Sequence, residues 1–133
     1  MPTNSQKLNS FELNPPSIHI GGTLGEALFL MQNASERTLF VVGEENKLIG
    51  VLTEGDLMRA FASNQLPHSS VSSFLNSSPI FSYDKLTEVE LINLFVTTGL
   101  LLLPIVDNEG RIIGAQSVRI ATSNLMNSIL PKL

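Results

Sequence analysis

The feature that most constrains this 133-residue chain is an internal repeat. Residues 39–53 read LFVVGEENKLIGVLT, and residues 103–117 read LPIVDNEGRIIGAQS. Each stretch is a short apolar strand, a polar turn and a second short strand. A hydroxyl residue ends both copies, Thr53 in the first and Ser117 in the second, where a helix cap is expected. A repeat on this scale predicts two similar folding units that pack together.

The repeat extends to both sides of these strands, so each half is predicted to run β-α-β-β-α. In the first half, a strand at 18–20 precedes a helix that begins at the capping-box pattern of residues 23–26, Thr-Leu-Gly-Glu. In the second half, a strand at 80–82 precedes a helix over about 86–98, and a last helix covers 118–130.

We divide the chain into four segments on this basis. Residues 1–7 are predicted to form a loose tail, 8–64 the first repeat, 65–70 a linker and 71–130 the second repeat. Within the first repeat, residues 8–13 are expected to make a helical turn. Because a unit of about 60 residues buries little surface alone, we expect an α/β (α+β) fold in which two such β-α-β-β-α units stack sheet to sheet around a pseudo-twofold axis.

The composition excludes several classes of function. Apolar residues make up 43% of the chain and charged residues 15%, which favours a full core over disorder. The net charge is −4 and the eight basic residues are scattered, so no nucleic acid partner is expected. The chain has no cysteine, which excludes disulfides and thiolate metal sites and is compatible with the cytoplasm.

No membrane partner is expected either. The most apolar region, residues 91–106, contains Pro104 and is shorter than the roughly 20 residues of a membrane-spanning helix. Residues 1–17 are polar and rich in proline, unlike a secretory signal. We therefore predict a cytoplasmic protein.

Together these residues resemble a tandem pair of CBS domains, also called a Bateman module. The stretch GVLTEGDL, residues 50–57, is similar to the family pattern of glycine, two apolar residues, threonine and, three positions later, aspartate. The second copy at residues 103–114 keeps the strands and the glycine, and the resemblance covers about residues 8–127. The Thr-Glu-Gly-Asp-Leu sequence at 53–57 looks most like the CBS pair at the front of some bacterial sugar-phosphate nucleotidyltransferases.

The resemblance implies a ligand and the residues that hold it. CBS pairs typically bind adenosine compounds between their halves, so it implies AMP, ADP or ATP as a regulatory ligand. It implies that Asp56 accepts hydrogen bonds from the ribose hydroxyls and that Thr53 lies near the α-phosphate, roles that suit a carboxylate and a helix start. The competing interpretation is that Thr53 and Asp56 only cap their helix.

Four further residues complete the predicted ligand-binding site. Ile18 and His19, on the first strand of the same half, are expected to flank the base. Arg37 precedes the second strand and Arg59 lies one turn beyond Asp56, so either guanidinium is a candidate to neutralise a phosphate.

The second half departs from the pattern, because Ile120 stands where the first half has its aspartate. An isoleucine cannot accept hydrogen bonds from a ribose. We therefore predict one functional site, in the first repeat, and a plain helix cap at Ser117.

No catalytic or metal-binding pattern is found. The glycine-rich residues 21–25 lack the lysine of a P-loop, and His19 and His68 have no partner at metal or nucleophile spacing. We expect a non-catalytic regulatory module that forms a homodimer. The helix face of Leu125, Met126 and Ile129 could contact a partner chain or pack in the core of its own chain. Two alternatives stay open: a structural dimerisation module with empty clefts, and the regulatory piece of a sugar-phosphate nucleotidyltransferase.

Overall fold

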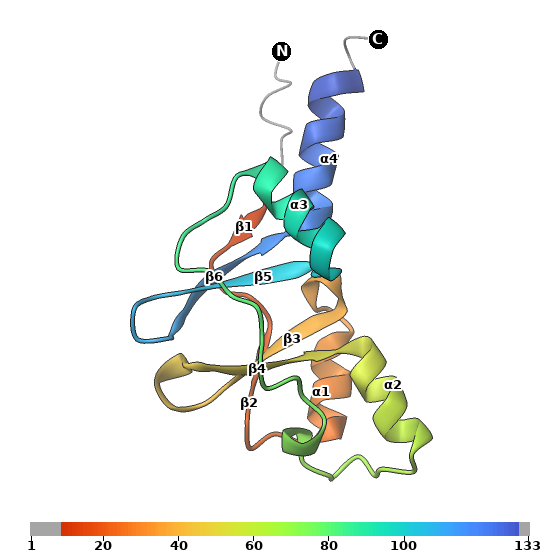
Figure 1. Ribbon diagram of the computed structural model, residues 1–133. Coiled ribbons are helices and arrows are strands. Elements are labelled where there is room, and N and C mark those ends of the chain that lie inside the picture. The colour runs from red at the N-terminus through yellow and green to blue at the C-terminus, as the bar shows by residue number, and fades with distance from the viewer. Residues whose placement is uncertain (1–8, 131–133) are drawn as a thin grey trace.

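The computed structural model describes residues 9–130, which form two small units of sheet and helix, one above the other (Figure 1). The loose tail expected at residues 1–7 lies outside the described residues. The two units correspond to the two sequence repeats, and their sheets face each other across the middle of the molecule. The predicted α/β fold of two packed repeats is confirmed.

The first unit follows the predicted order of elements. A three-stranded sheet has the order β2-β3-β4, with β2 parallel to β3 and β3 antiparallel to β4. A capping box at Thr23 and Glu26 starts the first helix, as the sequence predicts. The elements are β2 (Ser17–His19), α1 (Leu24–Met31), β3 (Thr38–Val42), β4 (Leu48–Thr53) and α2 (Glu54–Ala62).

The second unit repeats this arrangement with one shortened strand. The strand predicted at 80–82 is reduced to a parallel bridge between Ser82 and Ile105. Short 3-10 helices occupy Ser35–Arg37, Glu44–Asn46 and Val71–Ser73 elsewhere in the chain. The main elements of the unit are α3 (Glu88–Thr98), β5 (Leu102–Val106), β6 (Ile112–Ser117) and α4 (Val118–Ile129).

The segment before each unit pairs with the sheet of the other unit. The prediction of a helical turn within residues 8–13 is wrong. Phe11 and Glu12 form strand β1 (Phe11–Glu12), which pairs antiparallel with β6 of the second unit. Reciprocally, Asn76 exchanges two backbone hydrogen bonds with Val51 in β4 of the first unit. A segment this short cannot sustain a helix alone, whereas the free edge of β6 offers unpaired backbone groups.

Two glycines make this exchange possible. A Cβ placed on Gly50 would lie 2.5 Å from the carbonyl oxygen of Asn76, and one on Gly114 would collide with the ring of Phe11. Only a residue without a side chain lets the crossing segment approach this closely. This accounts for the glycine at equivalent positions of both repeats.

The core is divided into three apolar layers. Successive residues of β3 point to opposite faces, as expected for a strand covered on both sides. Phe40 and Val42 pack toward the second unit, against Leu102 and Val106 of β5. Their neighbours Leu39 and Val41 pack under α1 and α2, and a matching cluster lies under α3 and α4 around Leu91, Leu103 and Val118. Between residues 9 and 130, no helix has the length and apolar character needed to cross a membrane.

Candidate functional site

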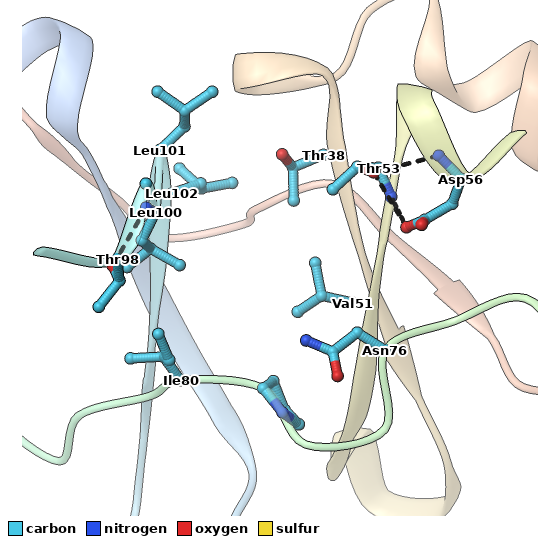
Figure 2. Close-up of a pocket in the computed structure, with 12 residues that line it drawn as sticks. Thr38, Val51, Thr53, Asp56, Asn76, Ile80, Thr98, Leu100, Leu101 and Leu102 are labelled. Carbon is cyan, nitrogen blue, oxygen red and sulfur yellow. Dashed lines mark hydrogen bonds between the residues drawn. The ribbon is translucent and has the colours of Figure 1, made fainter. Parts of the chain in front are cut away.

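A pocket of about 280 Å³ lies between the two units, and we call it the first cleft (Figure 2). Figure 2 shows Leu100, Leu101 and Leu102 of the second unit on one wall, facing Thr38 and Thr53 of the first. The full set of lining residues is Thr38, Val51, Thr53, Asp56, Asn76, Pro79, Ile80, Thr98, Gly99, Leu100, Leu101 and Leu102. Its volume is near the lower end of the range for small-molecule sites.

The carboxylate of Asp56 is held in place at the start of α2. Its Oδ2 accepts hydrogen bonds from the backbone N–H of Thr53 at 2.8 Å and from the Thr53 hydroxyl at 2.9 Å. The Thr53 hydroxyl in turn accepts from the Asp56 N–H at 3.2 Å, which completes a capping box. Thr53 and Asp56 therefore do cap their helix. Both residues also line the first cleft.

Arg59 further orients this carboxylate. Its Nη2 lies 2.6 Å from Oδ1 of Asp56, and the Asp56 side chain is 19% exposed. A carboxylate has about four acceptor positions, and these contacts use three of them. One acceptor position remains for a ligand, and a second becomes available if the exposed Arg59 side chain moves away.

A second hollow adjoins the first cleft at the beginning of α2. It has a volume of about 360 Å³ and shares Thr38, Thr53 and Leu101 with the first cleft. Glu36, Arg37, Glu54 and Gly55 complete its lining. The partial positive charge of a helix N-terminus favours an anionic group here.

The charges around this hollow are mixed. The guanidinium of Arg37 lies 4.0 Å from the carboxylate of Glu54, and both side chains are more than half exposed. The hollow is therefore lined by one cation, Arg37, and two carboxylates, Glu36 and Glu54.

The predicted base-flanking residues lie outside the first cleft. Ile18 is buried in the core of the first unit, packed with Leu24 and Leu39. His19 is exposed, and its Nδ1 accepts a hydrogen bond from the N–H of Gly21 at 3.0 Å. Neither lines the pocket, so their role beside a base stays a prediction.

Apolar residues from the second unit line the first cleft instead, and sequence reasoning missed them. Leu100 and Leu101 follow α3, and Ile80 comes from the segment that crosses β4. The sequence suggests only core strand for residues 100–103. The repeat is the one sequence signal for them. It places residues 99–101, between α3 and β5, at the position that residues 32–37 have between α1 and β3.

The position equivalent to the first cleft by the repeat lies at the start of α4, around Ser117 and Ile120, and is built differently. We call it the second cleft by this analogy. The Ser117 hydroxyl accepts from the N–H of Ile120 at 3.1 Å, as a helix cap should. The same hydroxyl donates to Oε2 of Glu36 at 2.7 Å, and Nε of Arg119 donates to that oxygen at 3.1 Å. A carboxylate from the first unit therefore covers the start of α4.

Comparison with known proteins identifies the class that this fold and cleft define. The CBS domain family matches residues 11–63, which run from β1 to the end of α2. A CBS domain-containing protein of Dictyostelium discoideum is 31% identical over 109 residues, covering 74% of this chain and 75% of the relative. The chain belongs to the CBS-domain family.

Solved structures extend the match to both units. The CBS domain pair of protein MJ0100, in complex with 5′-methylthioadenosine and S-adenosyl-L-methionine, has a TM-score of 0.74 at 20% identity and covers 87% of this chain and 94% of that one. The cytosolic domain of the Mg²⁺ channel MgtE, in complex with ATP, has a TM-score of 0.70 at 25% identity, with 85% and 46% covered. The chain is thus a CBS domain pair. Two further curated relatives are longer, and the chain spans 48% and 58% of their lengths.

Proposed function

We propose that this CBS pair is a non-catalytic regulatory module that binds an adenosine ligand, such as AMP, ADP or ATP, in the first cleft. The observation that carries the proposal is the Asp56 carboxylate, which is fixed at a helix start and lines a pocket between the units. The adenosine ligands named for the MJ0100 and MgtE structures support it.

The lining residues suggest how the parts of such a ligand would lie. One ribose hydroxyl would donate to the free acceptor position of Asp56, and the second would donate to the position that Arg59 leaves when its side chain moves away. The base would contact the apolar side chains of Val51, Ile80 and Leu100. The first phosphate would then lie at the N-terminus of α2, near Thr53 and Arg37.

The ligand would act by changing the arrangement of the two units or of a dimer. A ligand shifts an equilibrium only by its difference in affinity for the two states. We propose a cytoplasmic homodimer as the working form. The exposed apolar side chains of Met126 and Ile129 on α4 support an interface, which size-exclusion chromatography with light scattering tests.

A thermal-shift series with adenosine, AMP, ADP, ATP and S-adenosylmethionine tests ligand binding. A ligand at about 100 times its dissociation constant stabilises a protein by roughly 2.7 kcal/mol. We expect Asp56→Ala to remove this stabilisation. The matched control is Glu26→Ala, because Thr23 and Glu26 form the same capping box on α1 outside the first cleft.

The outcome also decides between the proposal and its alternatives. If none of these compounds stabilises the wild-type chain, the structural dimerisation module becomes the better account. That the chain spans about half of two curated relatives supports a further candidate, the regulatory piece of a longer protein such as a sugar-phosphate nucleotidyltransferase. An assay of the purified longer protein with and without the ligand tests that candidate.

A further inference from the structure

The two β-hairpins show which residues are equivalent in the two clefts. Thr38 is paired with Thr53 in the first unit, and Leu102 is paired with Ser117 in the second. Counting back two residues from each strand start makes Glu36 the counterpart of Leu100. Leu100 lines the first cleft opposite α2, so Glu36 occupies the matching place opposite α4.

Glu36 fills that place with a charge where the first cleft has an apolar side chain. Its side chain is 7% exposed, although the next residue in the same 3-10 helix, Arg37, is exposed. The carboxylate contacts the Ser117 hydroxyl and the Arg119 guanidinium, which lie 81 and 83 positions further along the chain. A carboxylate at a helix N-terminus is favoured by the helix dipole, and these partners compensate its burial.

The backbone at this point is held in an uncommon conformation. Glu36 and Arg37 have φ angles of 53° and 49°, in the left-handed region that residues with a Cβ rarely adopt. The Thr38 hydroxyl donates to the Glu36 carbonyl oxygen at 2.9 Å and supports the turn.

We propose that Glu36 is a built-in occupant of the second cleft. Its carboxylate takes the place that an anionic group of a ligand would take at the start of α4, and it closes that cleft to anions. Together with Ile120 in place of an aspartate, this limits the pair to a single ligand. The inference concerns the second cleft and does not rest on ligand binding in the first.

The contact also connects the two clefts. Glu36 and Arg37 line the hollow at the start of α2, and Thr38 lines both this hollow and the first cleft. The same three-residue segment therefore closes the second cleft and forms part of the first.

Inorganic phosphate is a suitable probe, because it tests the start of α4 without any adenosine. The experiment follows backbone amide signals of the ¹⁵N-labelled full chain by NMR during a phosphate titration. We expect the Ile120 amide to be unaffected in the wild type and to shift with saturation in Glu36→Ala. Glu45→Ala is the matched control, since Glu45 has the same backbone conformation, with φ of 59°, and an exposed carboxylate.

Each result supports or overturns the inference. Equal shifts of the Ile120 amide in wild type and Glu36→Ala would mean that Glu36 does not close the cleft. The absence of a shift in both would mean that its carboxylate is not standing in for an anion. A parallel titration of the wild type with ATP, followed at the Gly55 amide, reports on the first cleft, so failure of the proposed function is seen separately.

Discussion

The two clefts of this CBS pair share a framework and differ in what occupies it. In each, a β-hairpin ends in a hydroxyl residue that caps a helix, Thr53 for α2 and Ser117 for α4. The first cleft adds an oriented carboxylate, Asp56, and an apolar wall from the other unit. The second has Ile120 in place of the aspartate and is covered by Glu36. The clefts therefore differ at two positions in each half, Asp56 against Ile120 and Leu100 against Glu36.

Asp56 can also be compared with the other capping residues. Three complete capping boxes occur among residues 9–130, at the starts of α1, α2 and α3. Glu26 and Glu90 accept hydrogen bonds from the backbone N–H groups of Thr23 and Thr87 at 2.8 Å, as Asp56 does from Thr53. Neither of those glutamates lines the first cleft. A capping motif therefore explains local stability, and its location decides whether it also serves a ligand.

The largest effect is expected from making the first cleft like the second. Asp56→Ile removes the ribose acceptor, and hydrogen bonds to a charged group contribute about 1.5–3 kcal/mol. We expect the affinity for adenosine to fall by about tenfold or more. Isothermal titration calorimetry measures it.

The reciprocal change is the control for this prediction. Ile120→Asp is expected to leave the affinity unchanged and to add no second binding event, because Glu36 still covers that cleft. Unchanged adenosine binding by Asp56→Ile would show that the difference between the clefts does not lie at this position.

The two crossing segments offer a comparison with a smaller effect. Gly50→Ala forces Asn76 away from β4, and Gly114→Ala forces Phe11 away from β6. We expect each to lower the free energy of unfolding by about 1–3 kcal/mol, as measured by urea denaturation. Because Asn76 lines the first cleft, only Gly50→Ala should also weaken adenosine binding. Equal binding losses in both variants would indicate a global effect.

Arg59 should have a weaker influence. In Arg59→Gln the carboxylate loses one hydrogen-bond partner and gains an acceptor position for the ribose. An exposed ion pair of this kind contributes about 0.2–1 kcal/mol, so adenosine should bind more tightly by up to about fivefold. Calorimetry with adenosine, which has no phosphate to contact the arginine, isolates this effect. A loss of adenosine affinity would show that Arg59 positions Asp56 for the ligand.

The smallest effect is expected at the two hairpin turns. In the second unit, the side-chain hydrogen bond from Arg111 holds the pKa of Asp107 below its ordinary value, whereas Gly43 has the equivalent place in the first. A lowered pKa contributes stability above the pKa of the unfolded chain, about 3.9, and this is lost as the pH falls through the folded value. Arg111→Gln should therefore have a slightly lower free energy of unfolding than wild type at pH 6, as measured by urea denaturation. Below about pH 4 the difference between the two should be smaller. A difference that grows on acidification would contradict the assignment.

Local features of this fold could be read from the sequence because their causes lie within a few residues. The capping boxes at Thr23 and Thr53 place hydroxyl and carboxylate three positions apart, which is a signal that needs no knowledge of the fold. The buried strand at 39–42 is recognised by its unbroken apolar run. The stacking of the two units follows from the repeat, since neither half could bury its sheet alone.

The rest could not be predicted because it depends on contacts between distant segments. The pairing of β1 with β6 joins residues more than 100 positions apart, and no local pattern distinguishes it from a helical turn. The contact of Glu36 with Ser117 carries no sequence signal, because the left-handed backbone at Glu36 is not marked by glycine. The place of Ile18 on the first strand predicts a contact with the base, whereas its burial in the core depends on packing against Leu24 and Leu39 from other elements.

The most direct test of the central claim is a crystal structure of the full chain with adenosine at a saturating concentration. The account predicts one adenosine per chain, in the first cleft, with its ribose hydroxyls within about 2.5–3.2 Å of the Asp56 carboxylate oxygens. An adenosine bound at the start of α4, or bound in the first cleft with its ribose turned away from Asp56, would contradict it.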